Sequence, residues 1–272
     1  MIRKTERDTY ITEFMNITEL VHFIETNKPY KELEKYDING GYFYSKKTTP
    51  KYIQNVRTNN FEEAKDLLLH GWEYGTKEIK AKVEAKETGV ATKQKSVYDV
   101  VGYQASVPRY LQGIPTNMVN KVNMKQKNKV ITINKCATYA WKTKPQVIIN
   151  ESVKVLQLIN RLEKQGYRVN LNVVFGTNAI NKTITKVRIK SSSQRLNIKQ
   201  VAFPLVHPSM LRRIIFAVWE RLEENNNDVF KWGYGIVIGE DELKQYTNKG
   251  EYIIPPILYE KEITDIDKYK VV

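Results

Sequence analysis

The amino-acid sequence predicts an α/β fold, a largely parallel sheet covered by helices, with a mainly helical part at the N-terminus. From residue 129 onward, strand-like and helix-like segments alternate along the chain, which is the order typical of a covered parallel sheet. Two of the helical segments carry clear apolar stripes. Hydrophobic residues make up 41% of the 272 residues, enough for a sizeable core.

The N-terminal part, residues 1–96, is predicted to be mainly helical. Asn16 and Asn60 each precede apolar residues at helical spacing, and their side chains are suitable N-caps. The predicted helices lie at residues 17–25, 61–70 and 75–87. The polar, aperiodic residues 88–96 are interpreted as a loop before an α/β part at residues 97–272.

The α/β part opens with an irregular connection rich in Pro and Gly and then alternates between strands and helices. Strands are predicted at residues 129–134, 168–175, 183–190 and 233–239, and helices at residues 151–165 and 208–224. Asn150 is the expected N-cap of the first helix and Gly166 its end, while Pro208 fits the first turn of the second.

Positive charge is concentrated in one stretch of the chain. Over the whole sequence, 44 Lys and Arg face 30 Asp and Glu, a formal net charge of +14. Residues 121–200 hold 17 basic and 2 acidic side chains, whereas residues 1–120 hold 18 and 16 and residues 201–272 hold 9 and 12. Compositional drift would bring Glu along with Lys, as it does in the first 120 residues. The basic segment therefore predicts an anionic partner, most of all nucleic acid, because cations placed against phosphates release counterions.

The predicted strand at residues 183–190 supplies the first candidate binding residues. Strand alternation places Lys186, Arg188 and Lys190 on one face. Three neighbouring cations cannot all be buried unpaired, so this face is expected to be solvated or a binding surface. Ser192 and Arg195 follow and add donors of the kind that grip phosphates. A solvated edge strand protected by lysines is the alternative, and the regional charge excess favours binding.

Three further residues complete the candidate nucleic-acid site. Trp141 lies in the loop after the first strand of the α/β part, where its ring could stack on unpaired bases or plug the loop. Arg212 and Arg213 follow His207 near a predicted helix N-terminus, whose own field attracts anions.

The sequence offers no catalytic, metal or cofactor motif. Phosphate-binding loops, dinucleotide fingerprints, zinc-protease motifs and nucleophile elbows are all missing. One cysteine, Cys136, excludes an intramolecular disulfide, and three dispersed histidines have no metal-ligand spacing. No apolar run reaches the roughly 18 residues of a membrane span. We therefore expect no cofactor, no metal and no membrane partner, in a cytoplasmic protein.

Two resemblances follow from short motifs. Asn134-x-Cys136-x-Thr138 at a strand end resembles the metal site of von Willebrand factor A-type domains, although its carboxylate and first hydroxyl are replaced. This resemblance implies a Rossmann-like, doubly wound sheet without the metal. The chain also resembles a family of unknown function encoded by phages and mobile elements, which implies a bacterial host cell. The residues that carry it are Gly102, Val107-Pro108, Leu111-x-Gly113-x-Pro115-x-x-Met118, Leu162-Glu163-x-x-Gly166 and His207-Pro208-x-x-Leu211-Arg212-Arg213.

The sequence as a whole predicts a non-enzymatic nucleic-acid-binding protein that contacts phosphates with weak sequence preference. DNA and RNA, single- or double-stranded, stay open, as does the oligomeric state. The alternative is a protein-interaction module that covers an acidic host or viral protein, as an anti-defence protein or a particle component. An enzyme such as a nuclease ranks third, because it needs a carboxylate cluster and the basic segment offers only Glu151 and Glu163.

Overall fold

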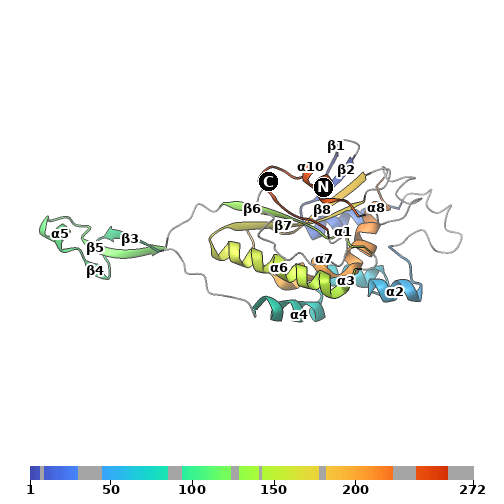
Figure 1. Ribbon diagram of the computed structural model, residues 1–272, viewed down its shortest axis with the longest axis horizontal. Coiled ribbons are helices and arrows are strands. Elements are labelled where there is room, and N and C mark those ends of the chain that lie inside the picture. Colours follow the sequence, from blue (N-terminus) through green and yellow to red (C-terminus); the bar gives the residue numbers. More distant parts are fainter. Residues whose placement is uncertain are drawn as a thin grey trace.

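A six-stranded mixed sheet forms the centre of the computed structural model (Figure 1). The structure describes residues 1–6, 9–29, 45–84, 94–123, 129–140, 143–177, 182–222 and 237–256. Within these residues the strands, in spatial order, are β1 (Ile2–Glu6), β2 (Thr9–Phe14), β8 (Lys182–Lys190), β7 (Arg168–Thr177), β6 (Val130–Cys136) and β9 (Tyr252–Ile254).

The sheet combines parallel and antiparallel pairs, and the predicted α/β class is confirmed. Three pairings are parallel: β2 with β8, β7 with β6, and β6 with β9. The pairs β1–β2 and β7–β8 are antiparallel. Only residues 178–181 separate β7 from β8, which is too short for the crossover that a parallel pair requires. The sheet is therefore mixed, with β6, α6 (Pro145–Lys164) and β7 as its parallel strand–helix–strand unit.

Helices cover both faces of the sheet unequally. One face packs against a large hydrophobic core that the N-terminal helices share with the later ones. These helices are α1 (Ile17–Thr26), α3 (Phe61–His70), α4 (Glu73–Glu84), α6, α7 (Ile198–Val206) and α8 (Phe216–Trp219). Figure 1 shows α3, α6 and α7 on the same side of the strands. On the other face, α10 (Glu240–Gln245) packs over a smaller cluster that includes Ile184 and Leu243.

Several element boundaries agree with the sequence and several differ. Asn16 and Asn60 cap α1 and α3 as predicted, each accepting a hydrogen bond from a first-turn amide. Helix α6 begins at Pro145, earlier than predicted, because proline is well suited to the first helical position. Strands β1 and β2 and helix α7 were not predicted at all. Residues 233–236 of the predicted strand 233–239 lie outside the described residues. In the described remainder, Val237 forms an isolated bridge with Thr177.

The helix predicted from Pro208 onward is interrupted by a π-helical segment. Residues 208–219 are helical, but Met210–Ile215 (η2) has the wider π geometry before α8 continues. No single helix in the described part of the chain is long and apolar enough to cross a membrane. Helix α7 and residues Met210–Trp219 meet the length and composition test only as a pair bent by 71°.

A small three-stranded unit, residues 94–123, is drawn apart from the body in Figure 1, and we call it the arm. It consists of β3 (Gln94–Asp99), β4 (Gln104–Ala105), α5 (Val107–Leu111) and β5 (Met118–Asn123), in the sheet order β3-β5-β4. None of the described side chains between residues 96 and 121 is buried. A Cβ at Gly102 would lie 2.2 Å from the Val119 carbonyl oxygen, so glycine is required where the backbone doubles back.

Two buried ion pairs tie α6 to the sheet. Lys135 of β6 is fully buried and its Nζ lies 2.8 Å from Glu151, also buried, near the start of α6. Lys190 of β8 is buried as well, and its Nζ lies 2.6 Å from Glu163 in the last turn of α6. Backbone carbonyls complete both ammonium sites, at Cys136 for Lys135 and at Val169 for Lys190.

Removing one partner of such a pair should be costly, because it leaves a buried charge without a counterion. We expect Glu151→Gln to lower the free energy of unfolding by about 3–5 kcal/mol. The double variant Lys135→Met/Glu151→Gln should recover most of that loss. Urea denaturation of the single and double variants measures both effects. The control is Glu73→Gln in the exposed Glu73–Lys77 pair, which should cost less than about 1 kcal/mol.

The arm should be removable without unfolding the body, since the described part of the arm contributes no buried side chain. Lys95 and Val122 are register partners in β3 and β5, so a two-residue Asn-Gly turn can replace residues 96–121. We expect the melting temperature of the body to stay within a few degrees of the wild-type value in differential scanning calorimetry. A large decrease would show that the arm packs on the body.

Candidate functional site

The three cations of β8 lie inside the sheet, not at its edge. Strand β8 is flanked by β2 and β7, so the edge-strand alternative is wrong. The expectation that Lys186, Arg188 and Lys190 share a face is also wrong. A register shift opposite Leu171 and Asn172 pairs Lys190 with Leu171, whose side chain belongs to the core beneath α6. This irregularity turns Lys190 toward α6, where it reaches Glu163.

Lys186 and Arg188 stay on the opposite face and are partly covered. Lys186 Nζ lies 3.4 Å from Glu13 of β2, and its side chain is only 12% exposed. Arg188 is half-buried, and its Nε has no hydrogen-bond partner among the described residues. Its neighbour in the register, Asn172, donates to Asn134 at 2.8 Å. This face is a polar surface of the sheet with little open cationic area.

Arg213 does not face a ligand, contrary to the sequence-based expectation. It is fully buried, and its guanidinium donates to the Thr58 hydroxyl, the Thr58 carbonyl and the Ser45 carbonyl at 2.7–3.0 Å. Ser45 in turn donates through its amide and its hydroxyl to Glu220. Burial lowers the pKa of Arg213. The residue therefore holds residues 45 and 58 against η2 and α8.

The remaining predicted residues have different surroundings. Arg195 is exposed, while Ser192 is half-buried and its amide donates to the Asn170 side chain at 2.7 Å. Arg212 lines a pocket at the other end of the sheet. Trp141 lies outside the described residues.

Exposed cations gather at the end of the sheet where β6 and β7 begin and where β8 and α6 end. We call these residues the basic rim: Lys129, Arg161, Lys164, Arg168 and Arg195. The Arg168 amide donates to the Lys129 carbonyl at 3.1 Å, which joins the starts of β6 and β7. Of the rim residues, only Arg195 was predicted from the sequence as a binding residue. The other rim residues were indicated only by the overall positive charge of residues 121–200. Their grouping in space depends on the topology of the sheet.

Both carboxylates of the basic segment are already paired. Glu151 and Glu163 are the only acidic residues between 121 and 200, and they are the partners of buried Lys135 and Lys190. Burial raises the pKa of Glu151, and the Lys135 ammonium opposes that effect. No unpaired carboxylate of this segment therefore weakens the positive field of the basic rim.

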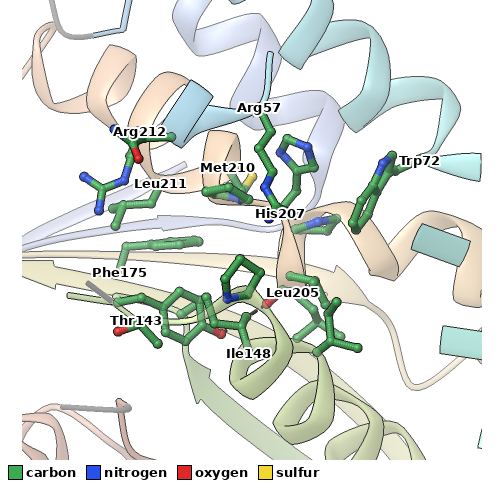
Figure 2. Close-up of a pocket in the computed structure, with 18 of the residues that line it drawn as sticks. Arg57, Trp72, Thr143, Ile148, Phe175, Leu205, His207, Met210, Leu211 and Arg212 are labelled. Carbon is green, nitrogen blue, oxygen red and sulfur yellow. Dashed lines mark hydrogen bonds between the residues drawn. The ribbon is translucent and has the colours of Figure 1, made fainter. Parts of the chain in front are cut away.

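A pocket lies at the opposite end of β6 and β7, beyond their carboxyl ends (Figure 2). Its walls come from the end of α2 (Pro50–Val56), the loop between β6 and α6, the first turn of α6 and the bend between α7 and η2. Most lining side chains are apolar, among them Ile148, Phe175 and Met210. The cavity measures about 60 Å³, room for a few water molecules or one small polar group.

The charged groups at the pocket are Arg57 and Arg212. Figure 2 shows Arg57 extending toward His207. Arg212 lies on one side of the pocket with Leu211 and Phe175, and Trp72 lies on the opposite side. Burial lowers the pKa of Arg212 to about 10, so it stays protonated at neutral pH. Among the described residues that line the pocket there is no Asp or Glu.

His207 lines this pocket and is uncharged at neutral pH. Its ring stacks on Phe203 with centroids 4.8 Å apart and meets Trp72 edge-on at 4.9 Å. Its Nδ1 accepts a hydrogen bond from the Ser209 amide. Burial, followed by the nearby Arg57 charge, lowers the pKa of His207 from 6.5 to about 3.

No catalytic or metal constellation is visible in the described part of the chain. Cys136 is buried, and burial raises the pKa of its thiol, which suits an inert core residue. No three His, Cys, Asp or Glu side chains of the described residues come together as a metal site.

A family model described as Domain of unknown function (DUF7192) matches residues 2–270 of the chain. No curated protein and no solved structure matches it. The resemblance to von Willebrand factor A-type domains and the origin in a phage or mobile element therefore stay expectations.

Acid should destabilise the protein through His207. Because its folded-state pKa is lowered, the unfolded chain binds the proton first, and stability present above pH 6.5 is lost as the pH falls toward 3. Between pH 6.5 and about 5, we expect up to about 1.4 kcal/mol of lost stability per pH unit. Urea titrations across this range measure the slope. In His207→Asn, which keeps an acceptor for Ser209, the slope should be shallower, and an equal slope would contradict this account.

Proposed function

The chain belongs to the family described as Domain of unknown function (DUF7192), and we propose that it binds nucleic acid through the phosphates, with the basic rim as the contact surface. Arg195, which the sequence predicted as a binding residue, is part of this surface, and Ser192 precedes it in the same loop. The β8 cations contribute less, because Lys186 and Lys190 already have carboxylate partners.

The pairing of Glu151 and Glu163 is the observation that carries this proposal. It buries Glu151 and engages the partly exposed Glu163 with Lys190, while the rim cations lie exposed at one end of the sheet. Exposed cations gathered at one end of a sheet are suited to a polyanion, because each phosphate contact releases a counterion. Contacts to phosphates do not distinguish one base from another, so a weak sequence preference is expected.

The test is a triple variant, Lys129→Gln/Arg168→Gln/Arg195→Gln, in which all three altered side chains are exposed. Fluorescence anisotropy with labelled single-stranded DNA, RNA and duplex, titrated against salt, measures affinity and its salt dependence. We expect weaker binding and a salt slope reduced by about 2 to 3, because each lost phosphate contact removes about 0.7 to 0.9 of slope.

A matched control changes the same net charge elsewhere. Lys51, Lys77 and Lys249 are exposed lysines outside the rim, and their replacement by Gln should leave the slope unchanged. If both triple variants lost affinity and salt slope equally, binding would depend on net charge alone and not on the basic rim. Absence of binding by the wild-type protein at low salt would overturn the proposal.

The arm favours a second candidate function, docking to an acidic protein. Seven large apolar side chains of the arm are more than half exposed: Tyr98, Val100, Val101, Tyr103, Val107, Tyr110 and Leu111. Exposed apolar groups of this density are typical of interaction surfaces. The arm also carries three basic residues and one acidic residue, Asp99, which suits a negatively charged partner.

The arm-replaced variant separates the two candidates. If the rim alone binds oligonucleotides, that variant keeps the wild-type affinity and salt slope, and the arm is left for a protein partner. A loss of affinity would instead assign the arm to nucleic acid, through stacking of its exposed tyrosines on bases.

A further inference from the structure

Strand β3 of the arm has the longest open sheet edge in the described part of the chain. The six-stranded sheet ends at β1 and β9, and the sheet of the arm ends at β3 and β4. Open edges pair readily with other strands, and charges, prolines or short length protect them. In β1 three of the five residues are charged, β9 has three residues before Pro255 and Pro256, and β4 has only two residues.

The edge of β3 is regular over its whole length. Its six residues, Gln94–Asp99, pair in unbroken register with β5, and Figure 1 shows β3 and β4 on opposite sides of β5. The strand contains no proline, glycine or bulge, and its two charged residues, Lys95 and Asp99, have opposite signs. Its free side therefore presents an uninterrupted row of backbone donors and acceptors to another strand.

The arm has few interactions that stabilise it alone. Its strands have two to six residues, and no described side chain between residues 96 and 121 is buried. The Arg109 guanidinium lies over the Tyr98 ring at 4.3 Å and donates to Thr116, so these contacts lie near the surface. Small sheets need further strands or a buried face for stability. A second sheet joined at β3 supplies further strands.

The sequence of β3 is complementary to itself in one antiparallel register. When two copies of a strand pair around a two-fold axis, one residue lies opposite its own copy. With Val97 at this centre, Lys95 of each copy is opposite Asp99 of the other, and Ser96 is opposite Tyr98. Opposite charges then meet at both ends of the pair, and two β-branched residues meet in the middle, which favours cross-strand pairing.

The neighbouring registers lack this complementarity. Centring the pair on Lys95 or on Asp99 places like charges opposite each other, which is unfavourable. Centring it on Ser96 places Lys95 opposite Val97, and centring it on Tyr98 places Asp99 opposite Val97. Of these five registers, only the one centred on Val97 pairs charges of opposite sign within β3.

Asp99 is available for a partner. The residue is exposed, and its carboxylate accepts a hydrogen bond from the Val100 amide at 2.7 Å. It forms no ion pair within the described part of the chain. Asp99 is also the single acidic residue among residues 94–123. Its place on the open strand, four residues after Lys95, is therefore not part of a wider acidic pattern.

We propose that β3 pairs antiparallel with β3 of a second copy of this chain, centred on Val97, so that two three-stranded arms form one continuous sheet. Backbone hydrogen bonds and two Lys95–Asp99 pairs hold the copies together. The area joined is small, so the dimer is weak and depends on concentration. The apolar side chains of Val107 and Leu111, in α5, stay available for another partner.

A dimer of this kind carries two basic rims. This consequence rests on the proposed function, whereas the dimer itself does not. A nucleic acid long enough to reach both rims gains from the second contact, because that contact becomes intramolecular. A short oligonucleotide meets one rim at a time and gains nothing.

Sedimentation velocity on the full chain, without nucleic acid, tests the dimer. Protein concentrations from about 1 µM to about 1 mM cover weak association. We expect a monomer–dimer equilibrium that shifts toward dimer as the concentration rises. The arm-replaced variant lacks Val97 and Asp99 and should stay monomeric over the whole range.

Charge exchange at the two ends of β3 tests the register. Lys95→Asp and Asp99→Lys each place like charges opposite each other twice, so each should weaken dimerisation about tenfold or more. These two changes alter the net charge in opposite directions, so general repulsion does not explain a loss in both. An equal mixture of the two variants should form a heterodimer, and the double variant Lys95→Asp/Asp99→Lys should dimerise like wild type.

A matched control makes the same charge change outside the arm. Lys51→Asp, at an exposed position of α2, should dimerise like wild type, as should the rim triple variant. Three outcomes would overturn the proposal: a wild-type protein that stays monomeric, a dimer that persists in the arm-replaced variant, and a mixture of the two charge variants that does not associate. Because the rim variant is tested for dimerisation and for oligonucleotide binding separately, failure of one proposal is distinguished from failure of the other.

Discussion

The two buried lysine–carboxylate pairs under α6 are the interaction on which the rest of the structure depends. Lys135 and Lys190 are buried cations, and Glu151 and Glu163 compensate their charge together with the Cys136 and Val169 carbonyls. The pairs lie near the two ends of α6, so they fix its position along β6 and β8. The same pairing affects the charge of the outer surface, since it involves Glu151 and Glu163, the two acidic residues of the segment 121–200.

The local elements were predictable wherever one short-range interaction dominates. The Asn16 and Asn60 caps define the starts of α1 and α3, and Gly166, with φ of 90°, follows the end of α6. Apolar alternation likewise located β7 and β8. By contrast, β1 and β2 are short, and they are strands because they pair with each other and because β2 also pairs with β8. Long-range partners of this kind leave no mark in local sequence.

The candidate sites were less predictable, because charge along a sequence does not reveal burial. Strand alternation assumes regular pairing, and the register shift near Asn172 sends Lys190 to the opposite face. Arg213 follows an exposed-looking Arg212, yet it is fully buried, since Thr58 and Ser45 arrive from distant segments. Arg57 gave no signal at all, because a positive φ at a non-glycine residue is imposed by the fold.

The two ends of the β6–β7 strand pair carry cationic groups of different kinds, and this difference has a physical origin. At the amino ends of β6 and β7, the cations are exposed and screened by solvent, which suits a long polyanion bound through many weak contacts. At the carboxyl ends, Arg212 lines a mostly apolar pocket, and the Arg213 network fixes the backbone of the Arg57 turn. The polar side chains buried near Arg57 thus fix the backbone of that turn, while the Arg57 side chain itself stays exposed.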